Sequence, residues 1–497
     1  MPKRYWIFLF WLCFVLRGTF HACALPLWEG FDEYNHFARI EYLATVGHDA
    51  TRETPVPQDI RQSLAVVPGM FGWSYDEFWR HTPEERQTGA PLVQHSIYEA
   101  QQPPVFYWLC AALFRATGFL SLSGHVLLLR IFCVLLASVV VPVGYWIARL
   151  VLDSEPQALG ATALVAALPL FTYTATHIAN DSLAIALGSV IVLLTLQRKG
   201  LALAVALGVA LLSKAYFLAF LPPVALLVFF RAAKQAAIAL TGAVLISGWW
   251  YWGNLASTGS LTGNLVLVQP SLGRMLAAVP EFPLVRTADF CWDGFVWMGN
   301  WSFLVARAWM YRVAGILAIL SSCGVARLLW RRNAQIWLLA AFASCFALAI
   351  LYFGLASFAA GTGAGSHGWY ACCVAAPAMI LAVAGLRQML PTRIERFGAA
   401  ALLVALSSIE LFAVNFYALP YYTGLISHTL QGGLPAAQLS QFGNGGFHLL
   451  FERLTLSKPG WVTGDALAAL WCIYILATLV LMGAALHLAL AERRNPQ

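Results

Sequence analysis

Twelve apolar runs divide this 497-residue chain and restrict it to a fold built in a lipid bilayer. Hydrophobic residues make up 60% of the chain, charged residues make up 11%, and the mean hydropathy is +0.71. A helix needs about 20 apolar residues to cross a membrane. The runs lie near residues 5–24, 125–150, 157–178, 181–197, 200–213, 216–231, 235–252, 312–330, 335–358, 369–387, 398–418 and 465–490. The sequence therefore predicts an all-α polytopic membrane protein with about 12–13 transmembrane helices.

Basic residues predict the orientation of these runs, because short cytoplasmic loops are enriched in Lys and Arg. Lys3 and Arg4 precede the first run, and no convincing cleavage site follows it. We therefore expect this run to be an uncleaved first helix that starts in the cytoplasm. The basic clusters later in the chain fall on the cytoplasmic side only under two conditions. The run 103–119 must be an interfacial or re-entrant helix that does not cross, and 200–231 must cross twice with a break at Ser213-Lys214. Those clusters are Arg149, Arg198-Lys199, Arg231/Lys234, Arg327/Arg331/Arg332, Arg387/Arg393/Arg396 and Arg493-Arg494. Both termini are then cytoplasmic, as in a protein of the bacterial inner membrane.

Acidic residues concentrate in one loop on the opposite, outer face. The loop 28–102 holds 12 of the 23 Asp and Glu residues, and we expect interfacial helices in it. The loops 253–311 and 419–464 lie on the same face, carry few charges and show no independent core. The sequence predicts a single membrane domain over 1–497 with these outer loops packed against it.

The formal charge of +7 does not indicate a nucleic-acid partner. The basic residues are scattered in twos and threes at the ends of apolar runs, which is a topology signal. Nearly all of the ten cysteines lie in apolar runs and are typical of small buried hydrophobes rather than a disulfide framework.

The strongest functional motif follows the first run directly. Residues 31–47 read FDEYNHFARIEYLATVG and predict a helix that stops at Gly47. On that helix Asp32 lies four residues and Glu33 three residues before His36, so all three side chains can converge near its N-terminal end. A cap at Asp32 and a favourable helix dipole at Glu33 remain the alternative. The position beside a membrane span favours catalysis, because acids are costly to bury in lipid.

Two further polar segments are expected on the same face. Tyr98 to Gln102 ends the acidic loop, and Pro103-Pro104 opens the next helix. Asn180-Asp181 follows the run 157–178, where Asp181 either caps the next helix or meets Asp32.

Together these motifs resemble the membrane-embedded GT-C glycosyltransferases. The resemblance rests on the acidic pair with His36, the Gln-Pro-Pro-x-x-Tyr start at Gln102, Asn180-Asp181, and Trp249-Trp250-Tyr251-Trp252-Gly253-Asn254 followed by Gly259. It covers residues 1 to about 390 and is closest to the bacterial branch that includes protein O-mannosyltransferases and lipid A aminoarabinose transferases. The set of motifs in this order is more specific than any one of them.

The resemblance implies a polyprenyl-phosphate sugar donor and inverting transfer on the outer face to an acceptor that the sequence does not name. Asp32 is the expected general base on the acceptor hydroxyl, because partial burial raises the pKa of a carboxylate. Glu33 or His36 would orient Asp32 or hold the acceptor, and Asp181 is the other expected catalytic acid. Tyr98 and Gln102 are expected to contact substrate.

The lipid-phosphate leaving group needs positive charge or hydrogen-bond donors rather than a proton. Lys214, a lone cation at an outward turn, is the first candidate, with a snorkelling interfacial lysine as the alternative. Arg286, Arg307 and Arg312 in the outer loop compete for the role. Some GT-C members use a divalent metal, and Asp32, His36 and Asp181 offer suitable ligand atoms without a fixed metal-binding spacing. For His36 a structural or hydrogen-bonding role is favoured.

A glycine-rich outer loop at 361–370 ends in His367-Gly368-Trp369-Tyr370. Relatives often place an Arg where this chain has Trp369. If that Arg holds the donor phosphate, His367 or Lys214 must replace it here, or the activity is altered. Trp369 and Tyr370 are expected to stack on a sugar or, alternatively, to anchor the membrane interface.

Two other classes of function compete with an enzyme. A transporter or flippase predicts ionisable groups near the bilayer midplane and repeated halves. Only a few charges, such as Arg17, Arg130 and Glu410, fall inside predicted spans, and no repeat is visible. The second alternative, a noncatalytic partner of cell-envelope enzymes, does not explain the presence of both Asp32 and Asp181.

Overall fold

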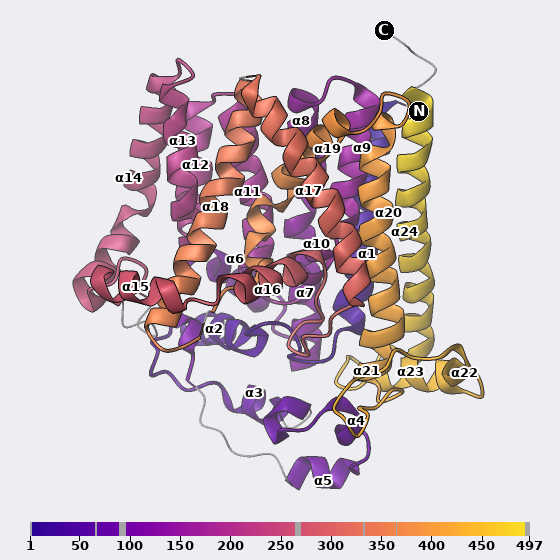
Figure 1. The fold of residues 1–497 in the computed structure, drawn as a ribbon. Helices are drawn as coiled ribbons and strands as arrows, with labels where there is room; N and C mark the ends of the chain where they lie inside the picture. The colour runs from indigo at the N-terminus through magenta and orange to yellow at the C-terminus, as the bar shows by residue number, and fades with distance from the viewer. Residues whose placement is uncertain are drawn as a thin grey trace.

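The computed structural model describes residues 2–64, 67–88, 96–263, 270–331, 333–363 and 365–492. Within these ranges the chain is helical, with two isolated β-bridges and no longer strand, and its helices stand side by side in a bundle (Figure 1). Seven described segments are long and apolar enough to cross a membrane. They are α1 (Lys3–Ala24), α7 with α8 (Leu122–Val151), α17 (Ala308–Trp330), α18 (Ala334–Ala359), η7 with α19 (Gly368–Met389), η8 through α21 (Glu395–Tyr422), and α24 (Gly464–Ala491). The prediction of an all-α polytopic membrane protein is confirmed.

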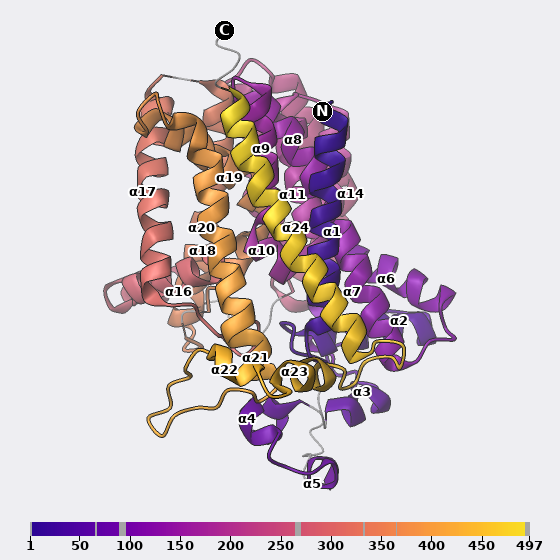
Figure 2. The same ribbon diagram turned by 90° about the vertical axis from the view of Figure 1, so that its right-hand side faces the viewer.

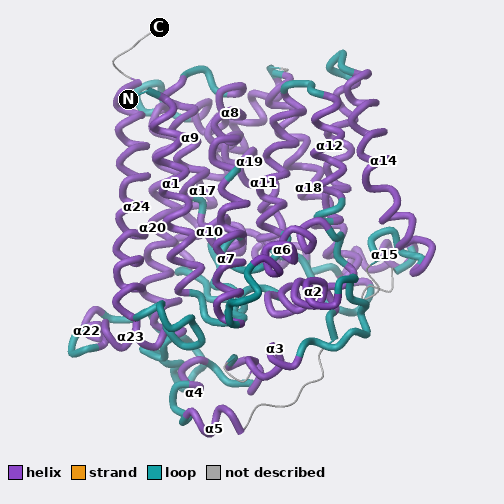
Figure 3. The backbone as a smooth tube through the Cα atoms, turned by 180° about the vertical axis from the view of Figure 1, so that it is seen from behind, coloured by secondary structure: helices purple, strands orange, loops and turns teal. Residues whose placement is uncertain are grey.

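The other five predicted runs form shorter, broken or more polar helices that stand in the same bundle (Figure 3). They are α9 (Glu155–Ala167) with α10 (Pro169–Thr174), α11 (Asp181–Leu196), α12 (Gly200–Leu211), η4 (Ala215–Phe220) with α13 (Leu221–Ala225) and η5 (Leu226–Val228), and α14 (Ala233–Thr258). Every predicted run therefore has a helical counterpart. The predicted break at Ser213-Lys214 lies between the end of α12 and the start of η4.

A buried arginine inside the bundle binds backbone carbonyls at a break between two helices. The α9–α10 break follows from Pro169, which has no N–H to donate and disfavours helical geometry at the residue before it. Arg17 of α1 donates to the buried carbonyls of Ala166 (2.7 Å) and Ala167 (3.1 Å) at this break, and it pairs with Glu410. This ion pair serves the scaffold, so it offers no support for a transport pathway.

The two ends of the bundle differ in character. α1 begins and α24 ends at the same end (Figure 2), where Arg387 pairs with Glu395 (3.5 Å) and Glu492 (3.3 Å). Shorter helices lie across the opposite end (Figures 1 and 3). These are α2 (Glu33–Val46), α3 (Gln58–Ser63), α4 (Tyr75–Phe78), α5 (Pro83–Thr88), η3 (Tyr98–Gln101), α6 (Val105–Ala116), α15 (Leu272–Ala278), α16 (Leu284–Val296), α22 (Leu439–Phe442) and α23 (Gly446–Leu454).

Helix α6 has the length of an interfacial helix rather than of a span. Its 12 residues give a rod of about 18 Å, whereas the hydrocarbon of a bilayer is about 30 Å thick. It packs along α2, where the rings of Phe37 and Phe114 meet edge to face with centroids 5.9 Å apart. The run predicted at 103–119 therefore forms a short helix alongside α2.

The outer segments contact one another over the end of the bundle. Asp76 accepts a hydrogen bond from His428 (3.0 Å), and Trp79 donates to the carbonyl of Tyr422 (2.8 Å). Glu29 accepts from the hydroxyls of Tyr75 (2.8 Å) and Ser302 (2.6 Å). Segments from all three outer loops thus form one layer over the helices.

Candidate functional site

Asp32 occupies the N-cap position of α2 but does not cap it. Its backbone is left-handed, with φ of +53°, and its side chain makes no capping hydrogen bond. Instead, one carboxylate oxygen accepts a 2.6 Å hydrogen bond from the hydroxyl of Tyr98 in η3. A left-handed non-glycine residue costs of the order of 1 kcal/mol or more, and such strain concentrates at functional sites. The capping alternative is not what the structure shows.

Burial raises the pKa of Asp32 and makes it a stronger base than an exposed carboxylate. The hydrogen bond from Tyr98 and the charge of Lys214 act in the opposite direction, whereas the charge of Asp181 adds to the rise. Lys214 and Asp181 therefore lie within electrostatic range of Asp32. All three residues stand at the same end of the bundle.

Glu33, the adjacent residue, belongs to the scaffold. It is fully buried, and its oxygens accept from Arg130 of α7 at 2.7 and 2.6 Å and from the backbone N–H of Ile178 at 3.0 Å. Arg130 also donates to the carbonyls of Leu25 (2.7 Å) and Pro26 (2.8 Å), which end α1. Burial alone would raise the pKa of Glu33, but the Arg130 guanidinium outweighs it and holds that pKa below its usual value. Glu33 therefore joins α1, α2, α7 and the start of α11.

His36 takes its hydrogen-bond partner from α6. Its Nδ1 lies 2.7 Å from the hydroxyl of Tyr107 in α6. Burial, together with the positive charges of Lys214 and Arg39, lowers the pKa of His36 well below its usual value, so the ring is neutral. The expected convergence of Asp32, Glu33 and His36 is not found, because α2 begins between η3, α7 and α6 and each side chain takes a partner from a different element.

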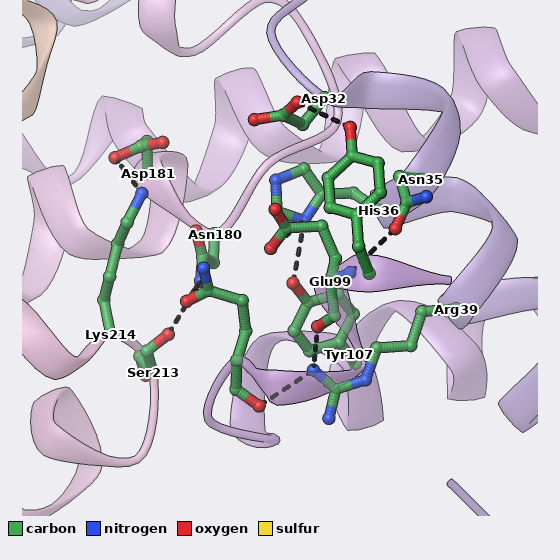
Figure 4. A network of polar contacts seen from close by, with 12 residues as sticks. Asp32, Asn35, His36, Arg39, Glu99, Tyr107, Asn180, Asp181, Ser213 and Lys214 are labelled. Atoms are coloured by element: carbon green, nitrogen blue, oxygen red, sulfur yellow. Dashed lines mark hydrogen bonds and ion pairs between the residues drawn. The ribbon is translucent and has the colours of Figure 1, made fainter. Parts of the chain in front are cut away.

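Asp181 and Lys214 form an ion pair beside this helix start (Figure 4). Asp181 is the first residue of α11, and its Oδ1 lies 2.5 Å from Nζ of Lys214. Tyr216 donates to the same oxygen at 3.3 Å. Only 12% of the Lys214 side chain is exposed, so Lys214 is not a lysine that snorkels freely into water. The pair places one cation within electrostatic range of Asp32.

A chain of hydrogen bonds connects these elements. Asn180 donates to the carbonyl of Ser213 (3.0 Å) and to the side chain of Gln102 (3.4 Å). Gly30 packs so closely on His177 that a Cβ atom at Gly30 would collide with it. The segment before Asp32, the end of η3 and the segment before Asp181 are thus held together.

Glu99 was not predicted as a site residue, yet the structure places it in the centre of the network (Figure 4). Its backbone N–H donates to the side chain of Asn35 (2.8 Å), and its carbonyl accepts from Arg39 (2.9 Å). Burial and the charge of Asp32 raise the pKa of Glu99 to about 7, against the opposing charge of Lys214. A sequence signal existed, since Glu99 lies between Tyr98 and the Gln-Pro-Pro motif.

The glycine-rich loop at 361–370 ends in stacked aromatic side chains. Trp369 stacks between Phe31 and His367, with centroid distances of 3.8 and 4.0 Å and interplanar angles of 9° in both cases. Burial lowers the pKa of His367 to about 4, so it brings no positive charge at neutral pH. Tyr370, the next residue, lies within electrostatic range of Asp32 and Asp181.

The predicted arginines lie elsewhere. Arg286 on α16, Arg307 and Arg312 are exposed, and Arg307 rests over the ring of Phe412 at 5.4 Å. No contact of the described residues joins Arg286 or Arg307 to Asp32 or Asp181. Lys214 is therefore the candidate cation that the fold brings to the acids.

The candidate metal ligands have other partners in the structure. In the described ranges no group of three or more His, Cys, Asp or Glu residues is arranged to hold a metal ion. Asp32 accepts a hydrogen bond from Tyr98, His36 contacts Tyr107, and Asp181 pairs with Lys214. These side chains therefore belong to a hydrogen-bond network, and a metal ion bound by all three stays a prediction.

Comparison with known proteins supports the family resemblance over part of the chain. Residues 60–259 match the family model described as dolichyl-phosphate-mannose-protein mannosyltransferase. This stretch contains Tyr98, Glu99, Asp181 and Lys214 and begins after Asp32. No curated protein matches the chain in sequence.

Two solved structures of ArnT from Cupriavidus metallidurans are similar to this one. The crystal structure bound to undecaprenyl phosphate has 15% sequence identity and a TM-score of 0.46, covering 97% of this chain and 77% of that chain. The apo structure has 14% identity and a TM-score of 0.40, covering 92% and 75%. The family match at residues 60–259 covers less than half of the chain, so this stretch, set in an all-helical membrane bundle, is similar to that family of mannosyltransferases.

Proposed function

We propose that this protein transfers a sugar from a polyprenyl-phosphate donor to an acceptor hydroxyl, with inversion at the anomeric carbon. The observation that carries the proposal is the pairing of a half-buried base, Asp32, with a cation, Lys214, on separate elements but in electrostatic range at one end of a membrane bundle. The family match names a dolichyl-phosphate sugar as the donor of related enzymes. A lipid donor keeps its chain in the bilayer and its phosphosugar at this boundary.

The reaction follows from the positions of these two groups. Asp32 accepts the proton of the acceptor hydroxyl while the acceptor oxygen forms a bond to the anomeric carbon. The bond from that carbon to the phosphate oxygen breaks, and the electron pair leaves with the lipid phosphate. Lys214 stabilises the negative charge that develops on the phosphate, and Asp181 holds the Lys214 ammonium in place. Attack from the face opposite the phosphate inverts the anomeric configuration.

We assign this chemistry to the outer face of the bacterial cytoplasmic membrane. The assignment rests on the basic clusters, several of which lie near the end where α1 begins, whereas Asp32 and the acidic loop lie at the opposite end. Reporter fusions in the loop at 122 and at the turn at 214 test the orientation. A cytoplasmic signal at either position contradicts it.

The proposal is tested by single-turnover transfer with protein reconstituted in lipid nanodiscs. Undecaprenyl-phosphate sugars serve as donors and envelope extracts as acceptors, with product stereochemistry read by NMR. Asp32→Asn should stop transfer while the protein remains folded. Transfer by Asp32→Asn at the wild-type rate, or retention of the anomeric configuration, overturns the mechanism.

A further inference from the structure

The side chain of Glu99 has an unmet hydrogen-bonding requirement. It is 6% exposed, and its Oε2 has no hydrogen-bond partner among the described residues. Leaving a buried charged oxygen unpaired is expensive, so native structures rarely do so without a functional reason. The backbone of Glu99 is held on both sides, because its N–H donates to Asn35 and its carbonyl accepts from Arg39.

The nearest protein group does not meet this requirement. Nδ1 of His36 lies 4.0 Å from Oε2, beyond hydrogen-bonding distance, and that nitrogen already contacts Tyr107 at 2.7 Å. A salt bridge would need a charged imidazole, and the buried His36 ring is neutral. Oε2 therefore keeps an unused acceptor position that no described residue fills.

Glu99 also lies beside the path of the proposed reaction. The charges of both Asp32 and Lys214 act on its carboxyl group. Figure 4 shows that group turned from η3 toward the side where Asn180 and Asp181 lie. In an in-line displacement the base and the leaving phosphate stand on opposite sides of the sugar ring, so a group in range of both flanks the ring.

The chemistry of an ionised carboxylate selects the part of the donor that it can bind. It accepts hydrogen bonds and offers none, and it repels a phosphate. Asn180 Oδ1, fully buried on the neighbouring segment, is a second acceptor without a hydrogen-bond partner among the described residues. Two buried acceptors match a ligand that brings hydroxyl donors, as a sugar ring does.

We propose that the Glu99 carboxylate binds a ring hydroxyl of the donor sugar and so makes the enzyme distinguish a sugar-bearing lipid from the bare lipid phosphate. This inference rests on the proposed function. A hydrogen bond between a hydroxyl and a charged acceptor is about twice as strong as a neutral one. Its loss should therefore weaken binding of the sugar-bearing lipid about tenfold or more.

The experiment compares binding of two ligands in nanodiscs, without acceptor. One is undecaprenyl phosphate, and the other is whichever of undecaprenyl-phosphate glucose, mannose or N-acetylglucosamine the wild type binds best. Glu99→Gln should reduce the preference for the sugar-bearing lipid about tenfold or more and leave the affinity for undecaprenyl phosphate unchanged. Glu53→Gln makes the same chemical change at an exposed position of the same loop and should change neither affinity. Lys214→Met should weaken both ligands equally.

The outcomes separate this inference from the proposed function. If the wild type prefers no sugar-bearing lipid over the bare phosphate, both proposals fail. If the preference exists and survives in Glu99→Gln, the role of Glu99 is refuted and the transferase proposal stands. Should Glu99→Gln not fold, Glu99→Asp keeps the charge but shortens the reach by one methylene, and an undiminished preference in that variant equally refutes the role.

Discussion

Two adjacent residues, the half-buried Asp32 and the fully buried Glu33, carry carboxylates with contrasting surroundings. Both oxygens of Glu33 are bound by Arg130, and one also accepts from the backbone of Ile178. Among the described residues, the side chain of Asp32 accepts a hydrogen bond from the neutral Tyr98, and Oε2 of nearby Glu99 has no partner. A fully paired charge stabilises a fold only modestly but is costly to disrupt, whereas an incompletely paired charge can still bind a ligand. The comparison distinguishes Glu33, whose carboxylate stabilises the fold, from Asp32, which we propose as the general base.

Asp32→Asn should lower the transfer rate about 10²- to 10⁴-fold, because it removes the general base without changing the shape of the side chain. Single-turnover kinetics in nanodiscs measure the rate. The thermal midpoint in detergent serves as the control and should stay close to that of the wild type. If Asp32→Asn unfolds the protein instead, Asp32 is a scaffold acid like Glu33 and the contrast disappears.

Glu33→Gln should show the converse behaviour and lower stability by about 3–5 kcal/mol, because the buried Arg130 guanidinium loses its counterion. Unfolding in SDS with the thermal midpoint as a second readout measures this effect. Arg130→Gln breaks the same pair from the other side and should cost a similar amount. A stable, inactive Glu33→Gln protein would instead place Glu33 in the chemistry.

Lys214→Met should weaken binding of undecaprenyl phosphate about tenfold or more, because the phosphate loses a charged partner. Lys199→Met, at the opposite end of the bundle, is the matched control and should bind normally. Lys214→Met also leaves the Asp181 carboxylate without its cation, which should lower stability. The double variant Asp181→Asn with Lys214→Met removes that carboxylate and should recover stability but not the affinity for undecaprenyl phosphate. Normal affinity in Lys214→Met would make the ion pair a scaffold element.

Asp32→Asn should lower the pKa of Glu99 from about 7, because the charge of Asp32 is one cause of its rise. The carboxyl band of Glu99 in infrared difference spectra recorded against pH measures this titration in nanodiscs, and Glu99→Gln identifies the band. An unchanged titration would show that the two acids titrate independently.

Arg286→Ala and Arg307→Ala should change the transfer rate less than about twofold, because exposed arginines without charged partners contribute little. The same single-turnover assay measures both. A large loss in either variant would mean that an outer arginine reaches the donor phosphate and that Lys214 is not the main cation.

The fold could be predicted from sequence because its signals are local. Each apolar run has a helical counterpart, and charge bias correctly located the break at Ser213-Lys214. The break between α9 and α10 was harder to predict in full. Pro169 marks the break, but the local sequence does not show that Arg17, from a distant helix, binds the carbonyls there.

The site was predicted in part. Asp32, Asp181, Tyr98 and Lys214 do gather at one end of the bundle, since each followed a recognisable motif near a run boundary. The direction of each side chain could not be predicted, because Asp32 leaves the helical path at φ +53° and the partners of Glu33 and His36 come from distant helices. Spacing along one helix cannot identify such partners.

The Arg17–Glu410 pair also bears on how the protein is made. The two residues are 393 positions apart, so the guanidinium enters the membrane with the first helix long before the ribosome has synthesised its counterion. Until α20 (Gly398–Ala413) is inserted, Arg17 must rely on water, lipid head groups or the translocon. Chains that stop before residue 410 should therefore be recognised by membrane quality control as incompletely assembled.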